Sequence, residues 1–242
     1  VTLKPKSVQT VAFHVRMPNE RFDGVLAGGI TFQEIQTEKD QTETKDQSLS
    51  IENEYTYIIA LLMRQTLNEV APNLTLHEVK PDQINARNVI LANVQNDQKT
   101  YINQVVIETK IKKKGHSEVL YQEEKEGLQI APNTNFSFPT ALNGQPLTPG
   151  EYHLTMTVLG NENENGKFSR KKGNTTINYT NQWVFKKDFT IDGKVAKELN
   201  TTDVTIKKDN NWIYILVASL FLLFILLCIL LFVLRKKEEK EK

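Results

Sequence analysis

The sequence predicts an all-β fold of Ig-like β-sandwich domains, followed by a single C-terminal transmembrane α-helix. Three observations support this prediction. Before residue 192, short segments alternate apolar and polar residues, which is the pattern of strands with one buried face. Turn residues separate these segments at short spacing, as they do in sandwiches. One unbroken apolar run lies close to the C-terminus.

Residues 212–234 form the apolar run and carry no charged side chain. Of these 23 residues, 18 are Leu, Ile, Val or Phe. At about 1.5 Å per residue, the run is long enough to cross the ~30 Å hydrocarbon core of a bilayer. A buried core helix is the alternative, but no helical domain is predicted that could cover all of its faces.

Basic residues set the predicted orientation of this helix. Arg235, Lys236 and Lys237 follow the run directly and begin the tail 235–242. The positive-inside rule therefore places the tail in the cytoplasm and the N-terminal part outside. Trp212 and Tyr214 are expected at the outer membrane interface, where amphipathic aromatic rings concentrate. The chain is thus predicted to be a single-pass protein of the plasma membrane.

The composition narrows the class of protein further. The 242-residue chain has a net charge of +1, so it offers no basic field for nucleic acid. Its one cysteine, Cys228, lies inside the apolar run, and the extracellular part can form no internal disulfide. Animal cell-surface sandwiches commonly carry disulfides. A chain without them favours a bacterial origin.

An Ala-Pro-Asn triplet at 71–73 is the predicted boundary between two domains. Residues 1–72 contain about three strands, the first at Val11–Met17, and these leave one apolar face without a partner sheet. We therefore expect a first sandwich that is completed by strands preceding Val1. Residues 73–192 alternate through about seven strands and predict a complete Ig-like sandwich. Residues 193–211 are predicted to form a polar stalk.

Four residues are predicted to have structural roles. Gly28 and Gly29 interrupt a strand, which indicates a β-bulge or a close approach of backbone. Asn133 belongs to an Ala-Pro-Asn turn. Tyr152 follows a turn and opens a strictly alternating segment. It resembles the residue of a tyrosine corner, whose hydroxyl bonds to main chain.

No catalytic, metal-binding or cofactor-binding site is predicted. The four histidines follow no metal-binding spacing, and no Gly-x-Ser-x-Gly motif occurs. The remaining candidate is the segment Asn161–Gly173, interpreted as a loop. It is either a solvated hairpin tip or a surface for an acidic partner or an anionic wall polymer. Its basic residues are Lys167, Arg170, Lys171 and Lys172.

Several separated motifs resemble one family of surface proteins from low-GC Gram-positive bacteria, the WxL-interacting proteins. Residues 17–24 (MPNERFDG) and 28–30 (GGI) resemble the end of its first domain. Residues 85–96 (NARNVILANVQN), 131–136 (APNTNF) and 149–152 (PGEY) resemble its second domain. The family also ends in one membrane helix and a short basic tail.

The resemblance implies a first domain that binds peptidoglycan, a second that binds host proteins, and WxL-domain surface proteins as partners. We therefore expect a non-enzymatic adhesion or scaffold protein that links the cell wall to host or extracellular ligands. One alternative is a membrane-tethered module that acts alone, either as a sensor or by binding carbohydrate or peptidoglycan. Another is a surface enzyme, because sandwich folds can host grafted active sites.

Overall fold

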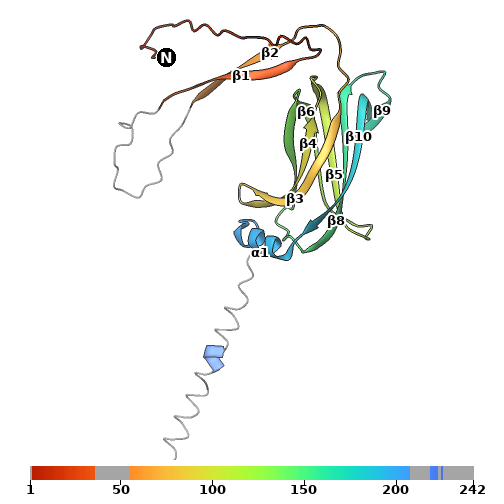
Figure 1. Cartoon of the computed structure of the whole chain (residues 1–242). Coiled ribbons are helices and arrows are strands. Elements are labelled where there is room, and N and C mark those ends of the chain that lie inside the picture. Colours follow the sequence, from red (N-terminus) through yellow and green to blue (C-terminus); the bar gives the residue numbers. More distant parts are fainter. Residues whose placement is uncertain (1, 36–54, 208–218, 223–224, 226–242) are drawn as a thin grey trace, which may run out of the picture. The chain divides into compact units, whose positions relative to one another are not determined.

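The computed structural model describes residues 2–35, 55–207, 219–222 and 225 (Figure 1). These residues contain ten strands and the helix α1, so the predicted all-β fold is confirmed for this part of the chain. No helix within it is long and apolar enough to span a membrane. The predicted membrane segment 212–234 lies almost wholly outside the described residues. The tail 235–242 and all five predicted membrane-interface residues also lie outside them.

Strands β1 (Leu26–Gln33) and β2 (Thr56–Met63) form an antiparallel two-stranded sheet. Their register runs without interruption, from Leu26 opposite Met63 to Gln33 opposite Thr56. The bulge predicted at Gly28 and Gly29 is therefore wrong. A β-carbon added to Gly29 would approach Ile58 Cγ2 to 3.2 Å, so this glycine permits a close approach within a regular ladder.

The strand predicted at Val11–Met17 is not present, and residues 2–25 contain no strand. Val11, Phe13 and Val15 are 38%, 52% and 50% exposed. Alternation alone does not make a strand, because a strand also needs a neighbour for its backbone hydrogen bonds. Phe13 instead packs edge-to-face against Phe32 of β1, with 6.1 Å between the ring centroids.

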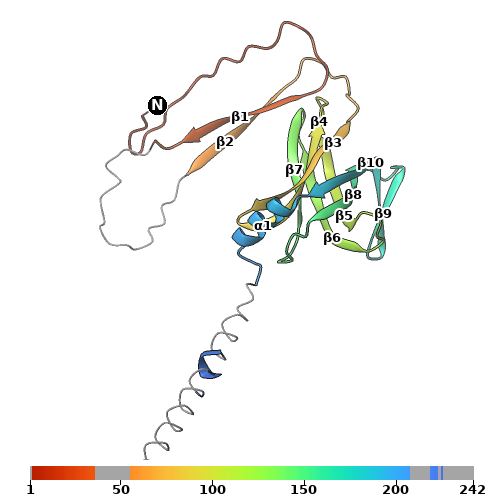
Figure 2. The same ribbon diagram turned by 60° about the horizontal axis from the view of Figure 1, so that its bottom comes forward.

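The remaining eight strands form two sheets, which Figure 2 shows as two layers. The three-stranded sheet has the order β3-β4-β7 and the five-stranded sheet the order β6-β5-β8-β10-β9. Their bounds are β3 (Leu74–Ile84), β4 (Arg87–Asn96), β5 (Ile102–Lys113), β6 (Val119–Ile130), β7 (Thr134–Ala141), β8 (Gly150–Glu162), β9 (Phe168–Lys172) and β10 (Thr175–Ile191).

The chain crosses from one sheet to the other between β6 and β7. The turn at 131–133 makes this crossing, and Asn133 adopts a left-handed conformation there with φ of 46°. Its backbone N–H donates to the carbonyl of Gln98 at 3.0 Å. Asn tolerates this conformation better than most residues, and the observed geometry agrees with the predicted turn. Consecutive strands therefore become edge strands of different layers.

The two sheets enclose an apolar core that a buried hydroxyl pair ties together. Thr109 Oγ1 on β5 and Thr140 Oγ1 on β7 lie 2.7 Å apart, and both residues are fully buried. Tyr152 is also fully buried, and its ring stacks on Phe189 with 5.6 Å between centroids. Tyr152 is therefore a core residue at the start of β8. The main-chain bond of a tyrosine corner stays a prediction.

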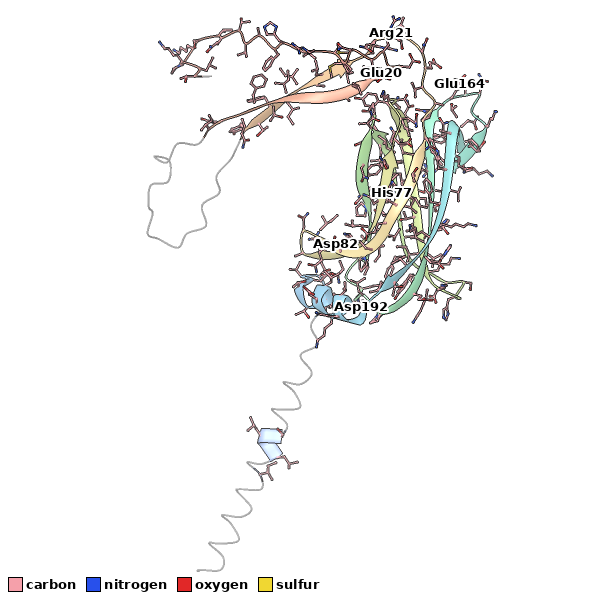
Figure 3. All side chains as sticks on the ribbon, viewed as in Figure 1. Glu20, Arg21, His77, Asp82, Glu164 and Asp192 are labelled. Atoms are coloured by element: carbon pink, nitrogen blue, oxygen red, sulfur yellow. The ribbon has the colours of Figure 1, made fainter. Side chains whose placement is uncertain are left out.

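The segment predicted as a stalk begins with helix α1 (Gly193–Thr202). The carboxylate of Asp192, labelled in Figure 3, accepts a hydrogen bond from the N–H of Lys194 at 2.7 Å and caps the helix. Asn200 Nδ2 donates to the carbonyl of Leu147, and its Oδ1 accepts from the N–H of Leu147, both at 2.8 Å. The stalk prediction is therefore wrong for these residues, because their polar groups bind folded backbone.

Asp203 ends the helix and is only 3% exposed. Burial alone would raise the pKa of its carboxyl group, but hydrogen bonds from Thr205 and from the backbone of Asn88 outweigh this effect and lower it. The bond from the N–H of Asn88 to Oδ2 is 2.7 Å long. The helix, Asp203 and Asn88 belong to one compact unit, which also contains residues 141–150.

Candidate functional site

An apolar cleft of about 380 Å³ lies between β6 and β7. Its floor contains Ile107, Ile130 and Phe138, all of which are buried. Leu128 and Phe136 are half-buried walls. Strand β6 ends the five-stranded sheet and β7 ends the three-stranded sheet. The cleft therefore opens along two edge strands.

Irregular pairing of β5 with β6 brings the cleft side chains onto one face. Ile107 lies opposite Lys125, and Val105 lies opposite Leu128. Residues 125 and 128 differ by three positions, whereas side chains of a regular strand share a face every two. Between them, Gly127 adopts a φ of 70°, as the glycine of a bulge commonly does. The bulge therefore places Lys125 and Leu128 on the same face of β6, where both line the cleft.

This cleft was not among the predicted sites, although the sequence contains a signal for it. Val119 and Tyr121 are apolar at odd positions, whereas Leu128 and Ile130 are apolar at even positions. A strand that changes parity must contain a bulge or end. Gly127 is the residue at which that change is least costly.

Lys125 is the only charged residue that lines the cleft. Its Nζ lies 6.0 Å from the centroid of the Phe138 ring, which is at the outer limit of a cation–π contact. None of the ion pairs formed by the described residues involves Lys125. The cleft therefore combines apolar walls with one positive charge that forms no ion pair with a described residue.

On the outer side of β6, Glu124 and Glu126 bind the basic segment predicted from the sequence. Arg170 donates to Glu126 Oε2 at 2.9 Å and also to Glu124. Lys172 Nζ donates to Glu126 Oε1 at 2.6 Å. The hydrogen bonds from Lys172 and Arg170 hold the pKa of Glu126 below its ordinary value. We call these four residues the edge-closing cluster.

The edge-closing cluster joins the two opposite edges of the five-stranded sheet. Strand β6 is the first strand of that sheet and β9 is the last. The sheet must therefore curl until side chains can bridge its edges. The curl covers a second apolar cluster, in which Phe168 and Ile177 pack against buried Val106, Leu159 and Tyr179.

The four predicted basic residues do not form one free patch. The segment interpreted as a loop contains β9, and Arg170, with a side chain 18% exposed, is committed to two carboxylates. Lys167 and Lys171 are exposed, and neither forms an ion pair with any described residue. A role of this segment in contacting a partner stays a prediction.

A second charged group involves β8 and β10. His153 Nδ1 lies 2.6 Å from Asp188 Oδ1, and Lys114 Nζ lies 3.2 Å from Asp188 Oδ2 and 3.3 Å from Glu151. The hydrogen bonds from His153 and Lys114 lower the pKa of Asp188. His77 lies on β3 (Figure 3) and contacts Gln95 at 2.7 Å. Among the described residues, no group of three or more His, Cys, Asp or Glu side chains could hold a metal ion.

The described strands define the structural class of the protein, a two-layer β-sandwich with an open apolar cleft. Comparison with known families makes the class specific. The family described as "WxL Interacting Protein, host binding domain" matches residues 46–201. The family described as "WxL Interacting Protein, peptidoglycan binding domain" matches residues 1–34. No curated protein and no solved structure matches the chain.

The chain belongs to the WxL interacting protein family, as its sequence motifs predicted. It is a cell-surface binding protein, in which residues 1–34 match the peptidoglycan binding domain and residues 46–201 match the host binding domain. The cleft and the edge-closing cluster both lie within the host-binding match. Strand β1 lies in the peptidoglycan-binding match, and its partner β2 lies in the host-binding match. The predicted boundary at 72/73 differs from both matched ranges and stays a prediction.

Proposed function

We propose that this chain is a non-enzymatic adhesion and scaffold protein that binds WxL-domain surface proteins and links the cell wall to host or extracellular ligands. One observation carries the proposal: the two binding-domain matches follow each other on a single chain, at 1–34 and 46–201. Two binding parts on one polypeptide can hold two surfaces together without any chemical step. Their linkage makes the second contact intramolecular and raises its effective concentration.

The sequence after the host-binding match supports a membrane anchor. Residues 212–234 are apolar throughout, and three basic residues follow them directly. A helix of that length would span the bilayer with residue 235 in the cytoplasm. In this arrangement the host-binding part lies nearest the membrane along the chain, and residues 1–34 lie farther from the anchor.

We also assign the sandwich to the Ig-like class. The sheet orders β3-β4-β7 and β5-β8-β10 correspond to the A-B-E and C-F-G strands of Ig-like domains, in which the B-to-C and E-to-F connections change sheets. In this scheme β6 is an added edge strand beside C, and β9 is an added edge strand beside G. Both added strands contribute residues to the edge-closing cluster, which links one to the other.

Capture by a purified WxL-domain protein tests the partner assignment. The whole chain, held in detergent micelles, is passed over the immobilised WxL-domain protein and over an immobilised unrelated β-sandwich of similar charge. We expect saturable retention on the first surface only. A stand-alone sensor or carbohydrate module predicts equal retention on both surfaces, and that result would reject the proposed partner.

Cell fractionation tests the anchor. A stop codon in place of Trp212 removes the apolar run and the basic tail together. We expect the shortened chain to leave the membrane fraction, and the part still bound to the wall measures the contribution of the wall-binding residues. An unchanged membrane-bound fraction would reject the anchor.

A further inference from the structure

We propose that the cleft between β6 and β7 is the docking site for an extended segment of a protein ligand. In this docking mode an apolar side chain of the ligand fills the cleft, and a neighbouring carboxylate of the ligand pairs with Lys125. The inference rests on the proposed function, because it names the surface through which the host-binding part would act.

The size of the cleft suits a side chain better than a large ligand. Its volume of about 380 Å³ lies near the lower end of the ~300–1,000 Å³ range of small-molecule pockets. Phe136 and Leu128 form walls that remain half-exposed, so apolar surface is available for burial. An inserted aromatic or branched aliphatic side chain would remove this surface from water.

The two edge strands favour an extended polypeptide over a small amphiphile. Among the described strands, β7 pairs only with β4, so one side of its backbone has no neighbouring strand, whereas the edge of β6 is bridged to β9 by the edge-closing cluster. An added strand can use the free backbone groups of β7, as in recognition by strand addition. Pro139 lacks a backbone N–H, and its place in β7 is of the kind that proline occupies at sheet edges. Pairing along β7 would therefore involve the residues before Pro139.

Charge complementarity selects an acidic segment. Lys125 is the only charged lining residue and has no carboxylate partner among the described residues. Its neighbours Glu124 and Glu126 face the other side of β6 and are neutralised there by Arg170 and Lys172. Glu123 precedes Lys125 by two positions on the same face of β6, so a ligand carboxylate would pair with Lys125 on the side of Leu128, away from Glu123.

A competing role for Lys125 is to protect the edge strand. Inward-pointing charges on edge strands prevent uncontrolled pairing with other chains. The sign of the charge separates the two roles. A protecting residue can be positive or negative, because either charge is costly to bury without a partner. A docking residue for a carboxylate must be positive.

The experiment compares two fluorescent peptides with blocked termini. The acidic probe alternates Val and Thr around a central Phe and has a Glu two positions after it. The basic probe carries Lys in place of that Glu. Binding to the whole chain in micelles of an uncharged detergent is measured by fluorescence anisotropy at low salt. We expect the acidic probe to bind at least about tenfold more tightly than the basic probe, which corresponds to about 1.4 kcal/mol.

The charge-reversed variant Lys125→Glu supplies the decisive measurement. We expect it to prefer the basic probe, because the unlike charges are exchanged on both sides. Loss of folding cannot produce this result, since it would abolish binding of both probes. The control Lys171→Glu makes the same charge change at an exposed position on β9, and it should keep the acidic preference.

Other outcomes decide against the proposal or separate it from the proposed function. A native chain that does not distinguish the probes overturns the docking site, as does a Lys125→Glu variant that still prefers the acidic probe. Self-association of Lys125→Ala without any probe preference in the native chain assigns the residue to edge protection and also overturns it. A reversed probe preference together with failed capture by the WxL-domain protein supports the cleft and rejects that partner alone.

Discussion

The two sides of strand β6 differ in whether their charged residues form ion pairs. On the outer side, Glu124 and Glu126 are bound by Arg170 and Lys172, and the contacts hold the curled sheet together. On the inner side, Lys125 lies at an apolar cleft without a carboxylate partner among the described residues. Adjacent residues of one edge strand thus have two different roles. Those on the outer side connect the edges of the curled sheet, and Lys125 on the inner side leaves its charge available at the cleft.

The largest effect that we expect comes from the floor of the cleft. Phe138 is 3% exposed, so Phe138→Ala should lower the free energy of unfolding by about 3–4 kcal/mol through lost burial and a new cavity. Phe136 forms a half-exposed wall, and Phe136→Ala should cost about half as much or less. Urea denaturation measures both values. Equal losses would contradict the distinction between a structural floor and an available wall.

A smaller loss is expected from breaking the edge-closing cluster. Arg170→Ala removes the contacts to both Glu124 and Glu126 and leaves these carboxylates with less compensation. We expect a loss of about 1 kcal/mol in the free energy of unfolding, because partly exposed ion pairs contribute little individually. Lys171→Ala is the matched control and should change stability by less than about 0.5 kcal/mol. If the two variants unfold at the same urea concentration, the cluster does not stabilise the sheet.

The outer side should also show a dependence on pH that the variant Glu126→Gln lacks. Hydrogen bonds from Lys172 and Arg170 lower the pKa of Glu126 from its ordinary value of 4.5. The resulting stabilisation is complete above pH 4.5 and is lost as the pH falls through the lower value of the folded chain. Urea midpoints measured downwards from pH 7 should therefore fall more steeply for the native chain than for the variant. Parallel curves would argue against the assignment.

The smallest effect belongs to the inner side. Lys125 is exposed and forms no ion pair with any described residue, so Lys125→Ala should change the free energy of unfolding by no more than about 0.5 kcal/mol. The same urea titration measures it. A loss as large as that of Arg170→Ala would mean that Lys125 has a structural role on the folded chain.

Local patterns predicted the fold class because the alternation of apolar and polar residues can be read within each strand of the sandwich. The glycine-containing stretch at 112–117 is a typical turn signal, and β5 ends at Lys113 and β6 begins at Val119 on either side of it. The late alternating segment that opens at Tyr152 is strand β8, with Leu154, Met156 and Val158 fully buried. Turn chemistry also located Asn133 correctly. These features depend on short stretches of sequence and need little information from distant residues.

The cleft and the edge-closing cluster could not be predicted in the same way. Arg170 binds Glu124, which lies 46 positions away in the sequence. The sequence around either residue contains no pattern that predicts the curl of the sheet. The strand predicted at Val11–Met17 failed for a related reason, because alternation does not supply a neighbouring strand. Helix α1 was missed although Asp192 is a recognisable N-cap residue. The segment after it mixes good helix formers such as Ala196 and Leu199 with poor ones such as Gly193 and Thr201.

Asp203 determines how the domain would respond to tension applied from its C-terminal side. The N–H of Val204 donates to the carbonyl of Ala86 at 3.0 Å, and the carboxylate of Asp203 accepts from the N–H of Asn88 at 2.7 Å. A pulling force that enters at residue 207 reaches these bonds before it reaches α1. These two hydrogen bonds therefore share the load with the last turn of the helix, and they fasten the chain after α1 to the loop and strand at residues 86–88.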